Sequence, residues 1–131
     1  MLFRSNRLCP FTGRRIRLES VHNAVEQAKT AALSLLGESH AYAQVPWFWS
    51  DQFDLKLQIA GLSGDHDRVV VRGNPDDASF SAFYLRSGKL IAVDAVNSPR
   101  DFMAGKQLIA AETVVDVGQL ADSTTTLFDL I

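Results

Sequence analysis

The stretch SFSAFYLRSGKLIAVDAV, from Ser79 to Val96, carries the clearest structural signal in the sequence. It contains two runs rich in aromatic, β-branched and other apolar residues, joined by Arg86-Ser87-Gly88. Two such runs around a short connection that contains glycine are typical of a β-hairpin. We therefore predict antiparallel strands over residues 79–85 and 89–96, with a tight turn between them.

Two more strands are predicted upstream of this hairpin. In residues 53–59, FDLKLQI, apolar and polar residues alternate, and a period of two is typical of a half-buried strand that includes Phe53. A second apolar run, residues 68–72, is closed by the turn signal Gly73-Asn74-Pro75. Three or four antiparallel strands that follow one another along the chain form a β-meander.

A helical pattern precedes the predicted sheet. From Ser20 to Gly37, apolar residues recur at intervals of three and four, which is typical of one face of an α-helix. Ser20 is suited to the N-cap and Gly37 to the C-terminal end. The residues of this apolar stripe are Val21, Ala24, Val25, Ala28, Ala31, Ala32 and Leu35. Because most of them are alanine, whatever packs on the stripe comes close to the helix backbone.

Helical signals also follow the hairpin. Ser98-Pro99-Arg100-Asp101 offers a serine N-cap, a proline for the first helical position and an acid that favours the positive end of the helix dipole. This helix is expected to run to about Ala111. The residues that we expect it to bury are Phe102, Met103 and Ile109. Asp116 with Gln119 is a capping-box candidate for a short last helix. This order of elements indicates an α+β fold, an antiparallel β-meander with flanking helices.

Length and composition limit the classes of function. A chain of 131 residues with 47% hydrophobic and 21% charged residues suits one ordinary globular domain. The net charge of -2 gives no reason to expect nucleic acid or an anionic membrane as a partner. No apolar run is long enough to span a bilayer. Cys9 is the only cysteine, which excludes a disulfide within the chain and suits a reducing compartment such as the cytoplasm.

The first eighteen residues contain five arginines and no acid. Such a composition is found in organellar targeting segments and also in exposed connectors. Cys9-Pro10 and Thr12-Gly13 interrupt any amphipathic helix there, which favours the connector.

The sequence offers little catalytic chemistry of its own. It has neither the glycine-rich loop that holds a dinucleotide pyrophosphate nor a Walker loop. His22, His40 and His66 lack metal-ligand spacing, and Gly64-Asp65-His66-Asp67 is simplest as a polar turn. We therefore predict no catalytic residue and no metal ligand.

Two features can nevertheless meet a ligand. The helix start at Glu19-Ser20-Val21 presents backbone amides that can bind a negative ligand oxygen. The aromatic run of VPWFWSDQ (45–52), with Trp47 and Trp49, can stack on a planar ring. The alternative explanation of both features is purely structural: a capped helix and hydrophobic packing.

Several segments together resemble a known family. They are RLESV (17–21), Asn23-Ala24, Gln27-Ala28, PWFWSDQ (46–52), LKLQIAGL (55–62) and IAVDAVNSPRDFM (91–103). The pattern is similar to the C-terminal part of the NADH-dependent, FAD-containing ferredoxin reductases that serve bacterial oxygenases and cytochromes P450. Putidaredoxin reductase and rubredoxin reductase belong to this group. The resemblance runs from about Gly13 to Leu120.

The resemblance implies a division of the chain into three parts. Residues 1–12 are an irregular start outside the family pattern. Residues 13–46 are the remnant of an FAD-binding domain, with one helix and a linker. Residues 47–131 are the reductase C-terminal domain. The two dinucleotide-binding folds of the family, and with them the NADH site, are absent from this sequence.

The resemblance also implies roles for particular residues. The start of the remnant helix lies at the pyrimidine end of the flavin, where Val21 contributes a backbone contact. Trp49 lies beside the isoalloxazine and Trp47 nearby. The implied FAD-contacting residues are Glu19, Ser20, Val21, Trp47 and Trp49.

Three interpretations of the chain follow from this resemblance. It is a fragment of a reductase that passes electrons to a ferredoxin, without NADH-dependent activity of its own. Alternatively, it is a free-standing module that binds a ferredoxin or a second copy of itself. In the third, it is a subunit whose nucleotide-binding folds are supplied by a separate chain.

Overall fold

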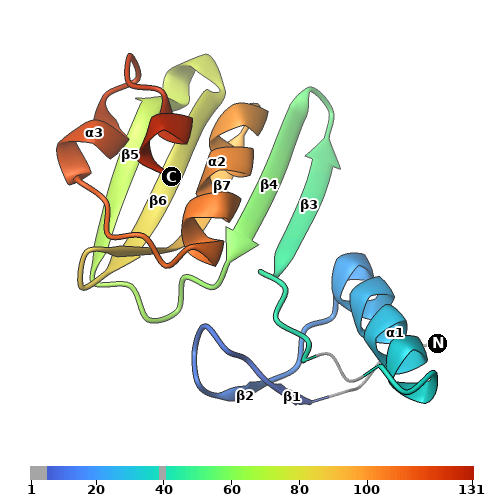
Figure 1. Ribbon diagram of the computed structural model, residues 1–131. Coiled ribbons are helices and arrows are strands. Elements are labelled where there is room, and N and C mark those ends of the chain that lie inside the picture. The colour runs from blue at the N-terminus through green and yellow to red at the C-terminus, as the bar shows by residue number, and fades with distance from the viewer. Residues whose placement is uncertain (1–5, 39–40) are drawn as a thin grey trace. The chain divides into compact units, whose positions relative to one another are not determined.

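The computed structural model describes residues 6–38 and 41–131, and the chain divides into two compact units, residues 1–48 and 49–131 (Figure 1). Within the first unit lie a small β-ribbon and a long helix. The second unit contains most of a five-stranded sheet and the remaining helices. Each unit is described below by itself.

The ribbon of the first unit consists of β1 (Arg7–Leu8) and β2 (Arg15–Ile16), which pair antiparallel. Between the strands, the backbone N–H of Cys9 donates to the carbonyl of Arg14 at 2.8 Å, and Cys9 is fully buried. We expected residues 1–12 to be irregular. The structure differs at Arg7 and Leu8, because backbone pairing with β2 orders them.

The predicted first helix is α1 (Val21–Leu35). Ser20 is its N-cap, and Gly37 follows the C-cap with a positive φ of 87°, as predicted for a glycine at this end. The helix buries only Asn23 among its residues, so its alanine-rich stripe is largely exposed in the part of the chain that the structure describes. At its last turn, Leu35 is 89% exposed.

The sheet is antiparallel and has the strand order β3-β4-β7-β6-β5 (Figure 1). Its strands are β3 (Trp47–Gln52), β4 (Leu55–Gly61), β5 (Arg68–Asn74), β6 (Ser79–Arg86) and β7 (Lys89–Val96). The predicted hairpin is β6 and β7, and Arg86 pairs with Lys89. Both turn residues between them, Ser87 and Gly88, have positive φ values, as in the two-residue turns that suit twisted hairpins. The predicted antiparallel α+β fold is confirmed, and β5, β6 and β7 form a meander, whereas β4 pairs with β7 rather than with β5.

One strand was not predicted and one boundary was wrong. The aromatic run begins β3, an edge strand, which brings the sheet to five strands rather than three or four. Phe53 is not part of a strand. It lies in the turn between β3 and β4 with a φ of 55°, and its side chain is fully exposed.

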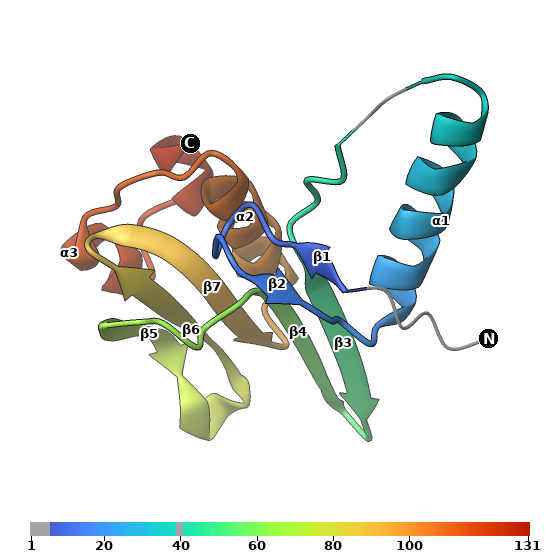
Figure 2. The same ribbon diagram turned by 90° about the horizontal axis from the view of Figure 1, so that it is seen from below.

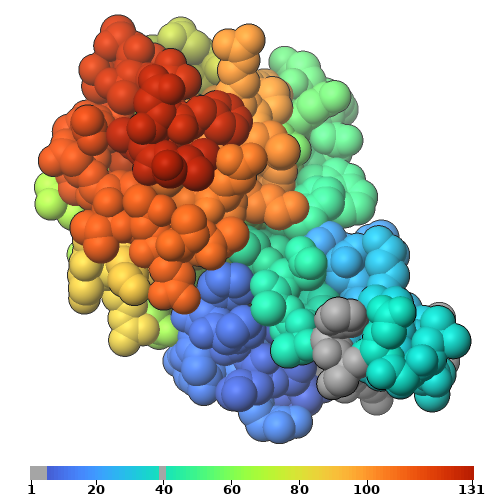
Figure 3. Space-filling model, viewed as in Figure 1, coloured from blue at the N-terminus to red at the C-terminus, as the bar shows by residue number. Residues whose placement is uncertain are grey.

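Helices cover one face of this sheet. The helix α2 (Pro99–Ala110) packs against β7 and β4, and α3 (Val117–Ala121) packs against β5. Figure 2 shows α2 and α3 on the same side of the sheet. Two 3-10 turns complete the unit, η1 (Pro75–Asp77) between β5 and β6 and η2 (Leu127–Leu130) against α2. In Figure 3, the C-terminal segment covers part of this helical face.

The core lies between the sheet and these helices. Its fully buried members include Phe83, Leu85, Leu90, Val93, Leu108 and Leu120. Phe102 and Ile109 are buried as predicted, whereas Met103 is 48% exposed. The predicted cap of α3 is confirmed, because the Asp116 carboxylate accepts from the N–H of Gln119 at 2.9 Å.

The predicted cap of α2 differs in detail. Ser98 is the N-cap residue, but its side chain makes no capping bond to the backbone of the helix. Its hydroxyl instead donates to Oδ2 of Asp101 at 3.0 Å. The serine therefore supports a polar network rather than the free amides of the helix.

Candidate functional site

The start of α1 is the first place where a cofactor contact was predicted. Oγ of Ser20 accepts a hydrogen bond from the backbone N–H of Asn23 at 3.2 Å. Val21, at the first helical position, is 65% exposed. Glu19 precedes the helix and forms an exposed ion pair with Arg17 at 3.1 Å. The first turn holds no acidic residue, so no carboxylate within it neutralises the positive end of the helix dipole.

Asn23 fixes the position of this helix start. Its side chain, only 1% exposed, donates from Nδ2 to the carbonyl of Leu18 at 2.8 Å. Its Oδ1 accepts from Gln27 at 2.9 Å and from the hydroxyl of Tyr42 at 3.3 Å. One buried amide thus joins the residues before α1, the helix itself and the segment after it. This role of Asn23 was not predicted. The sequence shows only that a polar residue lies in the first turn of the helix.

Trp47 lies close to the start of α1 within the first unit. Its ring centroid is 5.2 Å from that of His22, with the ring planes tilted by 48°. His22 directly follows Val21, so the structure brings two of the predicted regions together. The ring contact to His22 was not predicted, because the spacing of residues 22 and 47 along the chain gives no sign of it.

Trp49 belongs to the second unit and lies on the edge strand β3. Its side chain is 41% exposed, which leaves much of the indole open to a ligand. Trp47 and Trp49 are two residues apart on one strand and therefore lie on the same side of it. Roles in binding FAD remain predictions for Glu19, Ser20, Val21, Trp47 and Trp49.

Arg7 and Tyr42 form a second polar feature of the first unit. The guanidinium carbon of Arg7 lies 4.1 Å from the centroid of the Tyr42 ring, a cation–π contact. Burial raises the pKa of the Tyr42 hydroxyl, and the positive charge of Arg7 acts in the opposite direction. Neither residue was singled out from the sequence, where Arg7 was one of several arginines in a basic segment.

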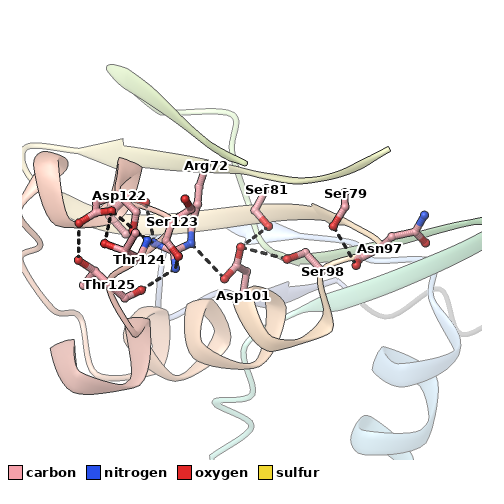
Figure 4. A network of polar contacts seen from close by, with 11 residues as sticks. Arg72, Ser79, Ser81, Asn97, Ser98, Asp101, Asp122, Ser123, Thr124 and Thr125 are labelled. Atoms are coloured by element: carbon pink, nitrogen blue, oxygen red, sulfur yellow. Dashed lines mark hydrogen bonds and ion pairs between the residues drawn. The ribbon is translucent and has the colours of Figure 1, made fainter. Parts of the chain in front are cut away.

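A pocket of about 400 Å³ lies on the helical side of the second unit, between β5, the start of α2 and the C-terminal segment. Arg72 reaches from β5 into this region, as Figure 4 shows. Its guanidinium donates to the carbonyl of Thr125 at 2.6 Å and also to the carbonyls of Leu120, Asp122 and Ser123. Nε lies 3.3 Å from Oδ1 of Asp101.

Two charged groups that line this pocket, Arg72 and Asp101, are bound by other groups of the protein. Oδ2 of Asp101 accepts from the hydroxyls of Ser81 and Ser98 at 2.9 and 3.0 Å. The side chain and amide of Thr124 donate to Asp122, and these bonds lower the pKa of the Asp122 carboxyl. The donors of Arg72 and the oxygens of Asp101 thus have partners within the protein, and these bonds hold the C-terminal segment in place. We therefore assign this network a structural role.

A further polar pair lies on the face of the sheet opposite to Phe83 and Val93. The hydroxyl of Tyr84 donates to Oδ2 of Asp94 at 2.7 Å. This hydrogen bond, together with burial and the negative charge of Asp94, raises the pKa of Tyr84 to about 12. The ring of His66 meets that of Tyr84 edge-on at 5.2 Å.

Within residues 6–38 and 41–131, no cluster of three or more histidine, cysteine, aspartate or glutamate side chains is arranged to hold a metal ion. None of the helices in these ranges has the length and apolar character that crossing a membrane requires.

Comparison with known proteins covers nearly the whole chain. A family model described as Reductase C-terminal matches residues 47–131. The ferredoxin reductase subunit of 5,5'-dehydrodivanillate O-demethylase from Sphingobium sp. is 49% identical over 118 residues, which are 90% of this chain and 29% of that protein. Putidaredoxin reductase CamA from Pseudomonas putida is 42% identical over 116 residues, 88% of this chain and 28% of its own length.

A third relative matches a longer part of the chain. Terpredoxin reductase from Pseudomonas sp. is 35% identical over 125 residues, or 95% of this chain and 30% of its own. The similarity therefore reaches into residues 1–12, which we expected to lie outside the family pattern. In all three comparisons the chain spans somewhat less than a third of the relative's length.

Solved structures share the fold. The ferredoxin reductase for the CYP199A2 system from Rhodopseudomonas palustris superposes with a TM-score of 0.88 and 41% identity, covering 93% of this chain and 30% of its own. The reductase in the covalent putidaredoxin reductase–putidaredoxin complex superposes with a TM-score of 0.87 and 40% identity, covering 92% and 29%.

Proposed function

Since the chain belongs to the reductase C-terminal family, we propose that it serves as the C-terminal portion of a ferredoxin reductase. Such an enzyme passes electrons from NADH through FAD to a ferredoxin that supplies an oxygenase or a cytochrome P450. The observation that carries the proposal is the family match over residues 47–131. Relatives with 42–49% identity that are named as reductases support it.

We assign residues 13–46 to one side of an FAD site and residues 47–131 to the reductase C-terminal domain. Bound FAD supplies the redox chemistry, and the protein supplies orientation and electrostatics. The residues present fit the flavin in part. The exposed start of α1 at Val21 favours negative charge on a ligand oxygen. Trp47 and Trp49 offer indole rings for stacking.

The chain alone is proposed to lack NADH-dependent activity, because its sequence contains no glycine-rich dinucleotide loop. The exposure of α1 favours a partner that completes the fold. Val21, Val25 and Leu35 are 65%, 46% and 89% exposed. Nucleotide-binding folds, in the same polypeptide or in a separate subunit, would cover this helix. We place the reductase in the cytoplasm, which suits a chain with one cysteine.

A second candidate function is an interaction module that binds a ferredoxin or a second copy of this chain. The same exposed side chains of α1 support it, because self-association would bury them. The two functions differ in what they require of FAD. The module needs none, whereas the reductase portion must contact the flavin.

A chimera tests the proposal directly. The part of putidaredoxin reductase that matches this chain, 28% of that protein, is replaced by this sequence. We expect the purified chimera to retain FAD and to reduce a ferredoxin with NADH. The matched control is the same reductase truncated at the junction. A chimera that binds FAD and NADH but transfers no electrons to any ferredoxin tested would contradict the proposal.

Titration of the isolated chain with FAD separates the two functions. Quenching of tryptophan fluorescence reports on Trp47 and Trp49, the only two tryptophans. FAD that binds more tightly than lumiflavin would support the reductase portion. FAD that quenches no more than lumiflavin, together with a concentration-dependent dimer in sedimentation, would support the interaction module.

A further inference from the structure

Phe53 forms an exposed apolar tip at one end of the second unit. It lies in the turn between β3 and β4 (Figure 1), and its side chain is fully exposed. Its φ of 55° falls in the left-handed region, which disfavours a bulky side chain. An aromatic residue at this position is therefore strained and gains nothing from packing within the chain. Strained positions of this kind cluster where a protein contacts a ligand or a partner.

Two carboxylates flank this phenylalanine. Asp51 and Asp54 are both exposed, and neither side chain makes an ion pair or hydrogen bond with a residue that the structure describes. The nearest positive residue along the chain, Lys56, follows the turn on β4. We call residues 51–54 the acidic tip, because one exposed phenyl ring lies between two negative charges. A surface that fits the acidic tip offers an apolar recess with positive charge at its rim.

The pocket between β5, the start of α2 and the C-terminal segment has these properties. Its volume of about 400 Å³ can receive a phenyl ring, and Leu127 and Phe128 contribute apolar walls. The charged residues that line it are two arginines and one aspartate. Arg72 is paired with Asp101, whereas the exposed Arg100 has no ion pair or hydrogen bond within residues 6–38 and 41–131. The guanidinium of Arg100 is therefore available to an incoming carboxylate.

The acidic tip and this pocket lie beside each other in the second unit. Asn97 donates from Nδ2 to the carbonyl of Asp54 at 3.2 Å, and its own carbonyl accepts from the hydroxyl of Ser79 at 3.5 Å. Ser79 and Ser98, the residue after Asn97, both line the pocket. Since Phe53 is fully exposed, it does not fill the pocket of its own chain. Two copies related by a two-fold axis can instead exchange tips, so that each copy places its phenylalanine in the pocket of the other.

From this complementarity we propose that the second unit associates with a second copy of this chain, the acidic tip of each copy occupying the pocket of the other. Phe53 supplies the apolar contact, and Asp54 pairs with Arg100 of the second copy. Two exchanged aromatic side chains and the walls that receive them bury roughly 600–1,000 Å² in total. Such an area is typical of weak, reversible interfaces. The proposal does not rest on the reductase function, and its contact surface is not α1.

An exchange of charges between variants of the full chain tests the proposal. Arg100→Asp makes the pocket rim negative, and Asp54→Arg makes the tip positive while it keeps the backbone carbonyl that Asn97 binds. Each variant alone places like charges together, whereas a one-to-one mixture restores an opposite-charge pair at both contacts. Arg68→Asp, at an exposed arginine outside both surfaces, is the matched control. Sedimentation velocity from micromolar to millimolar concentration measures the dissociation constant of the dimer.

We expect the parent chain to dimerise in a concentration-dependent manner. Arg100→Asp and Asp54→Arg should each weaken the dimer about tenfold or more, because two opposite-charge pairs become like-charge pairs. Their mixture should return to within about threefold of the parent chain. Arg68→Asp should stay within about twofold, as expected of a screened exposed charge. Phe53→Gly should weaken the dimer about tenfold or more without destabilising the monomer, which separates a docking residue from one that the fold needs.

Self-association through α1 is distinguished by Leu35→Ala, at the exposed end of that helix. If Leu35→Ala abolishes the dimer and Arg100→Asp leaves it unchanged, the helix is the contact and the proposal is wrong. A parent chain that stays monomeric at millimolar concentration would overturn the proposal as well. So would a mixture of the two charge variants that associates no more strongly than either variant alone. None of these results affects the chimera experiment, which tests the reductase function.

Discussion

Arg72 of β5 and Asp101 of α2 form a buried ion pair, with 3.3 Å between Nε and Oδ1. The remaining donors of Arg72 hold carbonyls of the C-terminal segment, including that of Thr125 at 2.6 Å. The remaining oxygen of Asp101 accepts from the hydroxyls of Ser81 and Ser98. One arginine thus connects the strand β5, the helix α2 and the C-terminal segment. These contacts hold the C-terminal segment in place within the second unit.

Replacement of Arg72 by methionine should lower the free energy of unfolding by about 3 kcal/mol, because Asp101 is left buried without its partner. Chemical denaturation measures this difference. The double variant Arg72→Met/Asp101→Asn should recover part of the loss. Arg68→Ala, an exposed arginine of the same strand, is the control and should change stability by less than about 0.5 kcal/mol. Equal effects at Arg72 and Arg68 would show that the pair contributes nothing specific.

Gly105 allows α2 to pack closely on β7. A Cβ atom at this position would lie 2.7 Å from Cγ1 of Val93. Gly105→Ala should therefore destabilise the protein by about 1–3 kcal/mol through overpacking, although alanine favours helix. Val93→Ala in the same chain should relieve the clash. Gly64→Ala is the control, because a Cβ atom at residue 64 would meet nothing within 4 Å. A neutral Gly105→Ala variant would mean that the helix shifts at little cost.

Much of the second unit could be predicted from the sequence because its signals are local. The hairpin of β6 and β7 follows from two apolar runs and a glycine turn, and α2 follows from its Ser-Pro start. The edge strand β3 was missed because it lacks an alternating buried face. Of its residues, Trp49 is 41% exposed and the last two are polar.

Fewer of the contacts at the candidate site could be predicted from the sequence. Ser20 was identified because capping depends on neighbouring residues. The contact of His22 with Trp47 and the stack of Arg7 on Tyr42 join positions far apart in the chain, so no local pattern reports them. Arg72 also went unnoticed, since a charged residue at the end of an apolar strand normally faces solvent.

Phe53 is held in a conformation that favours glycine. Its φ is 55°, its side chain is fully exposed, and it occupies the turn between β3 and β4. Phe53→Gly should raise the free energy of unfolding by about 1 kcal/mol, because the left-handed region is open to glycine without a steric penalty. Thermal and urea unfolding would both show the gain. A loss of stability would mean that the phenylalanine ring makes contacts that outweigh the backbone strain.

The hydrogen bond from Tyr84 to Asp94 should give the protein a defined alkaline response. The folded-state pKa of Tyr84 is raised to about 12, above the ordinary value of 10.0. A raised pKa means that folding favours the protonated hydroxyl. Its contribution to stability is therefore complete below pH 10, decreases between about pH 10 and 12, and is absent above that range.

Two measurements check this response. The ultraviolet absorbance of tyrosinate should show Tyr84 ionising near pH 12, with Tyr84→Phe identifying its contribution beside that of Tyr42, the other tyrosine. Asp94→Asn should move the pKa of Tyr84 back toward 10, because the hydrogen bond to the charged carboxylate is the largest cause of the shift. The same variant should flatten the decline of stability between pH 10 and 12. If Asp94→Asn leaves both the absorbance titration and the decline unchanged, burial of the ring rather than the carboxylate controls the ionisation of Tyr84.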